Sequence, residues 1–93
     1  MAETHSPIQI RFKAHGVRVM MRELNLDWIY EDYWDREWTN NLTRIIDSLE
    51  QWCKDAGIVN FSTGFTQIEL CVTFKHKKDA MMFKLRWHDA QTA

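Results

Sequence analysis

Three carboxylates in the segment 27–38 have a spacing that could support chemistry. Glu31 and Asp35 are four residues apart, with Asp32 between them. If this segment is helical, Glu31 and Asp35 lie on one face, where they could hold a divalent cation or share a proton. Such a pair of carboxylates more often forms a solvated acidic face than a catalytic or metal site. Glycosidase-type chemistry also requires a concave sugar cleft, which a chain of 93 residues seldom provides. We therefore predict an acidic surface.

Other catalytic signatures are absent from the sequence. It has no glycine-rich phosphate loop, no paired CxxC, no HExxH and no GxSxG motif. None of the four histidines has a carboxylate or cysteine at metal-ligand spacing on a predicted element. Cys71 and His76 are near in sequence, but Cys71 lies in the middle of a predicted strand and His76 follows its end. We predict no enzyme activity, no catalytic residue, no cofactor and no metal ion.

The same segment also concentrates aromatic rings. Its twelve residues carry five carboxylates and five rings, on Trp28, Tyr30, Tyr33, Trp34 and Trp38. Large rings are usually buried and clustered carboxylates must stay hydrated. The segment is therefore either an amphipathic element with one apolar face or an acidic contact surface. We predict that a partner protein with a basic surface binds an exposed patch made of Trp28, Tyr30, Glu31, Asp32, Tyr33 and Asp35.

The first part of the chain alternates apolar and polar residues. This alternation predicts a β-hairpin, with strands 8–12 and 17–21 and a turn at 14–16. A single long strand with a bulge at Gly16 is the alternative. In the hairpin, four cations face outward: Arg11, Lys13, Arg18 and Arg22. They could contact nucleic-acid phosphates, or they could protect the edge of a sheet by their charge.

A long helix follows, and its apolar residues form one stripe. At about 100° per residue the stripe is about 120° wide, and it consists of Trp34, Trp38, Leu42, Ile45, Ile46, Leu49, Trp52 and Cys53. The helix begins near Asp32 or near Thr39, and Gly57 caps its C-terminus. If it begins near Asp32, the carboxylates lie at the positive end of the helix dipole.

The rest of the chain predicts two strands and a second helix. A strand at 58–61 leads through a turn at 62–64 into a strand at 65–75, and a helix spans 76–87. The inward residues of the longer strand are Ile68, Leu70, Val72 and Phe74. The order β-β-α-β-β-α predicts a single α+β domain over residues 1–93, with polar tails at 1–7 and 88–93. Its two-layer sandwich has two helices on one face of an antiparallel sheet, as a ferredoxin-like variant.

The overall charge and composition limit the classes of partner. The net charge of −1 favours neither nucleic acid nor anionic lipid. The longest apolar run, at 80–83, is too short to span a membrane, and the N-terminus lacks the pattern of a signal peptide. We therefore expect a cytoplasmic protein with reduced cysteines. Segments 27–38 and 75–86 carry opposite charges, which could pair within the fold or between copies in a homo-oligomer.

One stretch resembles a known group of proteins. In Phe74-Lys75-His76-Lys77-Lys78-Asp79-Ala80-Met81-Met82-Phe83-Lys84-Leu85-Arg86-Trp87, a strand ending in Phe leads through a polar turn to Asp-Ala, then to Phe, Leu and Trp on a helix. The pattern is similar to the C-termini of short, mostly uncharacterised tailed-phage proteins. The resemblance implies a compact α+β phage accessory protein of ferredoxin-like type, acting in the host cytoplasm, and it transfers no active site.

These observations favour an interaction protein. Aromatic anchors dominate interface energies, and clustered carboxylates suit a basic partner, including a nucleic-acid-binding cleft occupied by mimicry. We therefore expect a small modulator or inhibitor of a host or viral protein. The alternative is a nucleic-acid-binding protein that uses the basic hairpin face.

Overall fold

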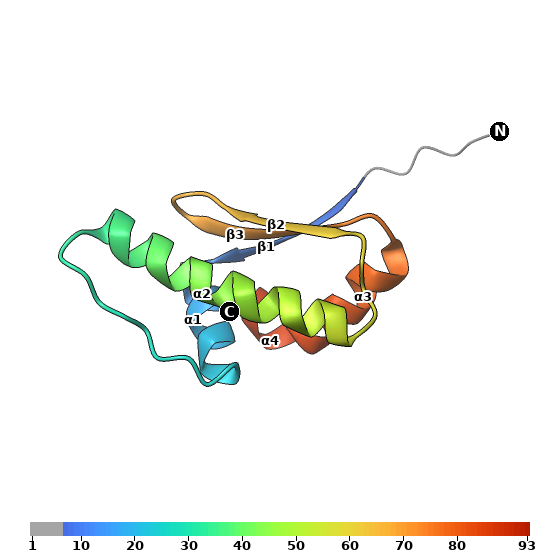
Figure 1. Cartoon of the computed structure of the whole chain (residues 1–93), viewed down its shortest axis with the longest axis horizontal. Helices are drawn as coiled ribbons and strands as arrows, with labels where there is room; N and C mark the ends of the chain where they lie inside the picture. Colours follow the sequence, from blue (N-terminus) through green and yellow to red (C-terminus); the bar gives the residue numbers. More distant parts are fainter. Residues whose placement is uncertain (1–6) are drawn as a thin grey trace.

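The computed structural model describes residues 7–93, and its strands form one antiparallel sheet. The strands are β1 (Ile8–Lys13), β2 (Phe61–Phe65) and β3 (Glu69–Phe74), arranged in the order β1-β3-β2. The helices are α1 (Ala14–Glu23), α2 (Trp34–Asp55), α3 (Lys77–Arg86) and α4 (His88–Thr92). Figure 1 shows these helices together on one side of the sheet. The protein therefore has an α+β fold with a three-stranded antiparallel sheet.

The alternation of side chains in β1 and β3 produces one buried and one exposed face of the sheet. The register pairs Ile10 with Val72 and Phe12 with Leu70, and all four side chains are buried against the helices. The opposite face is polar and consists of Gln9, Arg11, Lys13, Ser62, Gly64, Glu69, Cys71 and Thr73. The predicted inward positions Leu70, Val72 and Phe74 are confirmed.

Helix α2 confirms the long helical stripe. Trp38, Leu42, Ile45, Leu49 and Cys53 are buried, because their spacing places them on the face that packs against the core. The helix ends in a Schellman motif. Gly57 has a φ of 82°, and the N–H of Ile58 donates to the carbonyl of Cys53 at 2.8 Å. The predicted glycine at the end of the helix is thus also confirmed.

The expected β-β-α-β-β-α order is not confirmed, because the second predicted strand is helical. Residues 14–23 form α1, with Val17, Met20 and Met21 buried. These three residues have the spacing of a helix face, although Val17, Val19 and Met21 also fit a strand. A run this short fits both the two-residue period of a strand and the 3.6-residue period of a helix, and the strand prediction was wrong. Helix α1 also ends in a Schellman motif, with Asn25 at a φ of 57°.

Two further parts of the chain differ from the sequence prediction. The predicted turn at 62–64 lies inside β2, and the true turn at 66–68 leaves the Ile68 side chain exposed rather than inward. The predicted polar tail at 88–93 contains α4, whose Ala90 is buried. Most of the predicted N-terminal tail, residues 1–6, lies outside the described residues. The turn at 66–68 is held locally, since the Thr66 hydroxyl accepts from the N–H groups of Ile68 and Glu69.

Helices α1 and α4 approach closely at Gly16. A Cβ atom on Gly16 would lie 2.2 Å from the carbonyl oxygen of Ala90, which is backbone and cannot rotate away. The sequence suggested a turn at this glycine. Its role in the structure is instead to let the backbone of α4 approach α1.

We predict that Gly16→Ala destabilises the protein by about 1–3 kcal/mol, the usual cost of overpacking a core. In an uncrowded helix the same change gains roughly 0.5–1 kcal/mol, so the sign of the effect reports the α1–α4 contact. Urea unfolding measures it. Gly64→Ala is the control, since a Cβ atom there meets no atom within 4 Å. A stabilised Gly16→Ala variant would contradict the packing.

Candidate interaction surface

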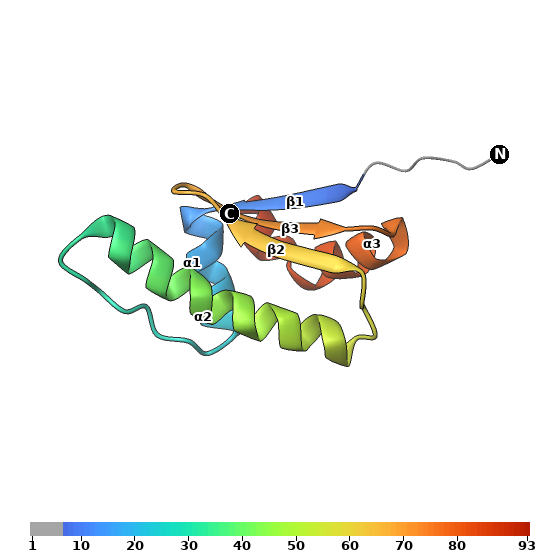
Figure 2. The same ribbon diagram turned by 45° about the horizontal axis from the view of Figure 1, so that its top comes forward.

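The segment that links α1 to α2, residues 24–33, lies in extended form alongside α2 (Figures 1 and 2). We call it the connecting segment. It has no regular secondary structure, so its backbone polar groups must find partners elsewhere. Side chains of α2 supply several of these partners, and the positions of the aromatic residues depend on them.

Asn41 holds the backbone of Ile29 on both sides. Its Oδ1 accepts from the Ile29 N–H at 2.9 Å, and its Nδ2 donates to the Ile29 carbonyl at 2.8 Å and to the Glu37 carbonyl at 2.7 Å. The Asn41 side chain is fully buried. Nearby, an Arg44 Nη1 donates to the carbonyl of Asp27. The middle of the connecting segment is therefore held against α2 at Asp27 and Ile29.

Glu37 holds the segment one turn earlier in α2. Its carboxylate accepts from the Trp28 Nε1–H at 2.8 Å and from the Glu31 N–H at 3.0 Å. These bonds, led by the one from Glu31 and aided by the charge of Arg18, outweigh desolvation and lower the pKa of Glu37 below its ordinary value. Glu37 therefore stays ionised and fixes both a ring and a backbone group.

Three tryptophans form a cluster at this end of the molecule. The ring centroids of Trp34 and Trp38 are 5.5 Å apart and those of Trp28 and Trp34 are 6.3 Å apart, both in stacked orientation. The Arg18 guanidinium lies 4.2 Å from the centroid of Trp28. The Trp38 Nε1–H donates to the carbonyl of Thr66 at 2.6 Å. The cluster thus joins the connecting segment, α1, α2 and the β2–β3 turn.

The structure places the rings of the predicted patch in two different environments. Tyr30 and Tyr33 are 72% and 71% exposed, whereas Trp28 is half-buried in the tryptophan cluster. Among the carboxylates of the patch, Asp32 and Asp35 are exposed and Glu31 is half-buried. Trp34, which the sequence assigned to the buried stripe, is 47% exposed. The outward rings are therefore Tyr30, Tyr33 and Trp34, and Trp28 anchors the segment.

A shallow cavity extends this surface toward the sheet. It has a volume of about 300 Å³ and lies between the first turns of α2 and the β2–β3 turn. Its lining residues are Asp35, Trp38, Thr39, Phe65, Thr66 and Gln67. Phe65 is partly exposed beside it, and Ile68 projects from the same turn. The exposed apolar area therefore continues from the connecting segment to the tip of the sheet.

Sequence analysis missed the two residues that position the patch, Glu37 and Asn41. A signal was present for Asn41, which lies three residues after Trp38 and four before Ile45. A polar residue within an apolar stripe is a candidate for a buried hydrogen-bonding role. No local pattern identified its partner, because Ile29 is twelve residues away in the chain.

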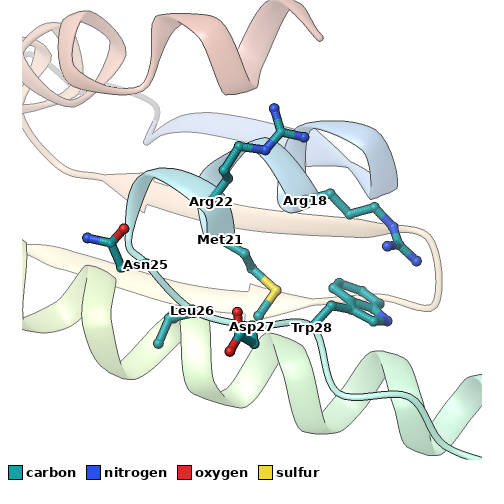
Figure 3. Close-up of a pocket in the computed structure, with 7 residues that line it drawn as sticks. All are labelled: Arg18, Met21, Arg22, Asn25, Leu26, Asp27 and Trp28. Carbon is teal, nitrogen blue, oxygen red and sulfur yellow. The ribbon is translucent and has the colours of Figure 1, made fainter.

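The four basic residues of the alternative prediction do not share one surface. Arg11 and Lys13 lie on the exposed face of the sheet, where an Arg11 Nη1 is 3.9 Å from the Glu69 carboxylate. Arg18 and Arg22 lie on α1, beside a cavity of about 430 Å³ that also contains Asp27. Figure 3 shows Arg18 extended toward the Trp28 ring, whereas Arg22 extends away from that ring. The basic hairpin face is therefore not formed.

The remaining reactive side chains form no recognisable centre in the described chain. Burial, together with the charges of Asp79 and Glu50, raises the pKa of the Cys53 thiol to about 11, so Cys53 stays protonated. Cys71 is a free thiol on the exposed sheet face. Within residues 7–93, no three His, Cys, Asp or Glu side chains are grouped so that they could hold a metal ion.

The helices described here include none long and apolar enough to cross a membrane. No protein-family model, curated protein or solved structure matches this chain. Any function must therefore be inferred from the geometry of the surface.

We predict that Asn41→Ala destabilises the protein by about 2 kcal/mol or more, because it leaves backbone groups of Ile29 without partners. Asn40→Ala is a matched control, since Asn40 is exposed on the same helix and its substitution should change stability by less than about 0.5 kcal/mol. Both changes alter helix propensity equally, so urea unfolding of the two isolates the side-chain bonds. Equal stabilities would contradict the assigned role.

We predict an acid transition of the connecting segment that depends on Glu37. The lowered pKa of Glu37 means that its stabilising effect is complete above about pH 4.5 and is lost as pH falls through the lower folded-state value. Tryptophan fluorescence and near-ultraviolet circular dichroism should report the release of Trp28 below pH 4.5.

Glu37→Gln tests that transition. The Trp28 indole and the Glu31 N–H donate to different carboxylate oxygens of Glu37, and the amide replaces one of these oxygens with an NH₂ group that only donates. The variant should show the released signal already at neutral pH and lack the acid transition. An acid profile identical to that of the wild type would assign the transition to other carboxylates.

Proposed function

We propose that this protein is a non-enzymatic interaction module that binds another protein through the aromatic-acidic surface. That surface consists of Trp28, Tyr30, Glu31, Asp32, Tyr33 and Asp35, extended by Trp34. The observation that carries the proposal is the fixed backbone beneath the exposed rings. Asn41 and Glu37 hold Ile29, Glu31 and Trp28 in place while Tyr30 and Tyr33 point into solvent.

A fixed backbone favours binding because little conformational freedom remains to be lost. Ordering a mobile loop on association reduces affinity, whereas a preorganised one avoids that cost. Tyrosine and tryptophan combine large apolar area with few rotatable bonds and are enriched among the residues that dominate interface energies. Tyr30, Tyr33 and Trp34 have both properties, a large apolar area and few rotatable bonds. Their exposure has no evident benefit for stability, since exposed rings gain little from the core.

The charges around the rings indicate the chemistry of the partner. Asp32 and Asp35 are exposed and Glu31 is half-buried, while Arg36 is the only cation within 27–38. A basic partner surface would complement them and be steered toward them. A nucleic-acid-binding cleft is one such surface, which the carboxylates would occupy by mimicry. The resemblance of residues 74–87 to tailed-phage proteins supports a modulator or inhibitor of a host or viral protein, acting in the host cytoplasm.

We predict that the double substitution Tyr30→Ala/Tyr33→Ala weakens partner binding by at least about tenfold, as expected for two aromatic anchors. Asp32→Lys should weaken it as well, by opposing a basic partner. Because these side chains are exposed, the melting temperature should change little. A photocrosslinking amino acid at Tyr33 would capture the partner from nuclease-treated lysate, and titration of the purified partner would then give each Kd.

The matched control is Leu85→Ala, a truncation of a side chain that is 81% exposed on the basic helix α3 and does not belong to the proposed surface. It should leave the Kd unchanged. Equal weakening by Leu85→Ala, or unaltered affinity in the double variant, would remove the surface from the proposal. Binding that disappears with nuclease would instead support a nucleic-acid partner.

A further inference from the structure

Strand β2 forms one edge of the sheet and carries no charged residue. Its sequence is Phe61-Ser62-Thr63-Gly64-Phe65, and it pairs with β3 on one side only. Figure 2 shows it as an outer strand, with α2 alongside on the helical side of the sheet. The flanking residues Asn60 and Thr66 are also uncharged. Exposed strand edges readily pair with other strands, and proteins usually prevent this with charges or proline.

The opposite edge has such protection. Strand β1 carries Arg11 and Lys13 and follows Pro7, the only proline of the chain. A second copy aligned along β1 would bring like charges together. The two edges of the sheet therefore differ in their capacity for pairing, and β2 is the permissive one.

The hydrogen bonds to β3 show which groups of β2 face outward. The Lys75 N–H donates to the Asn60 carbonyl at 3.2 Å, and the Thr66 N–H donates to the Glu69 carbonyl at 2.8 Å. Hydrogen-bonded pairs alternate along an antiparallel ladder, so Ser62 and Gly64 also bond to β3. The backbone N–H and C=O groups of Phe61, Thr63 and Phe65 consequently face away from β3, at the open edge.

We propose that β2 pairs antiparallel with β2 of a second copy, about a two-fold axis through Thr63. In this register Thr63 lies opposite the partner's Thr63, and Phe61 lies opposite the partner's Phe65. All of these residues present outward backbone groups, so the pairing closes about six hydrogen bonds and joins the two sheets. The edge is complementary to itself, as a two-fold interface requires. This inference goes beyond the proposed function and does not depend on it.

The side chains fit the same register. Phe61 and Phe65 face the helical side of the sheet with Thr63, since they pair with Phe74, Leu70 and Val72 of β3. Phe61 is half-buried and Phe65 is 37% exposed, so pairing would bring two partly exposed rings together on each side of the axis. On the opposite face, Ser62 lies opposite the partner's Gly64, and neither is bulky or charged.

The Glu50 carboxylate opposes the pairing, so a substitution at Glu50 tests it. The Thr63 hydroxyl donates to a Glu50 carboxylate oxygen at 3.4 Å. Because Thr63 lies on the axis, the two copies of Glu50 approach one another, and like charges near an interface weaken association. Glu50→Gln removes the repulsion and keeps a polar neighbour for Thr63.

Charge placement at Ser62 and Gly64 tests the register directly. Both positions lie on the face of the sheet opposite the helices, and a Cβ atom at Gly64 meets no atom within 4 Å, so the fold should accept substitution at both. In Ser62→Lys/Gly64→Lys, each lysine faces a lysine of the second copy. In Ser62→Lys/Gly64→Glu, each lysine faces a glutamate instead. The two variants change the same positions of the monomer. They differ in whether the charges that meet across the axis repel or attract each other.

Sedimentation velocity of the full chain under reducing conditions, over a rising concentration series, measures the dimer. We expect a wild-type monomer–dimer equilibrium, loss of the dimer in the Lys/Lys variant, its retention in the Lys/Glu variant, and a tighter dimer in Glu50→Gln. Circular dichroism establishes that each variant is folded. A wild type that stays monomeric up to about 1 mM would overturn the proposal. Equal dimerisation of the Lys/Lys and Lys/Glu variants would overturn the register.

Discussion

The connecting segment must satisfy its backbone hydrogen bonds without forming a helix or a strand, and this constraint shapes the end of the protein that carries the tryptophan cluster. Asn41 and Glu37, on adjacent turns of α2, provide partners at Ile29, Glu31 and Trp28. A buried amide and a carboxylate are costly inside a protein unless they are paired. Here they are paired with backbone and indole groups, so segment and helix stabilise each other. Loss of either side chain would leave part-buried groups of the segment without their partners.

The arrangement of the aromatic residues follows from these bonds. Trp28 is drawn into the cluster with Trp34 and Trp38, whereas Tyr30, between the bonded backbones of Ile29 and Glu31, stays 72% exposed. Trp38 links the cluster to the β2–β3 turn, because its indole N–H donates to the Thr66 carbonyl. A rigid aromatic surface therefore arises at one end of a small protein. The edge of β2 runs toward that same end, so a two-fold pairing would place the two aromatic surfaces at opposite ends of a dimer.

Part of this architecture could be predicted from the residues alone. The apolar stripe from Trp38 to Cys53 and the glycine after it specify α2. A long run of residues with a period of 3.6 fits a helix and does not fit a strand. The alternation in β1 and β3 likewise specifies which side chains are buried. Long, strongly periodic segments contain enough positions to exclude the alternative period. The aromatic-acidic composition of 27–38 also singled out a segment with exposed rings, Tyr30 and Tyr33, but did not indicate its internal arrangement.

Tertiary contacts decided the rest. The pattern of residues 14–23 fits both a strand and a helix. In the fold these residues form α1, which packs against α4 where Gly16 lies close to the backbone of Ala90. The exposure of Tyr30 and Tyr33 depends on bonds between Ile29 and Asn41 and between Trp28 and Glu37, which are distant in sequence. Amphipathic periodicity is a local property that the sequence determined by itself. The choice of partner for a buried amide or an indole N–H depends on which segments meet, and only the folded chain brings them together.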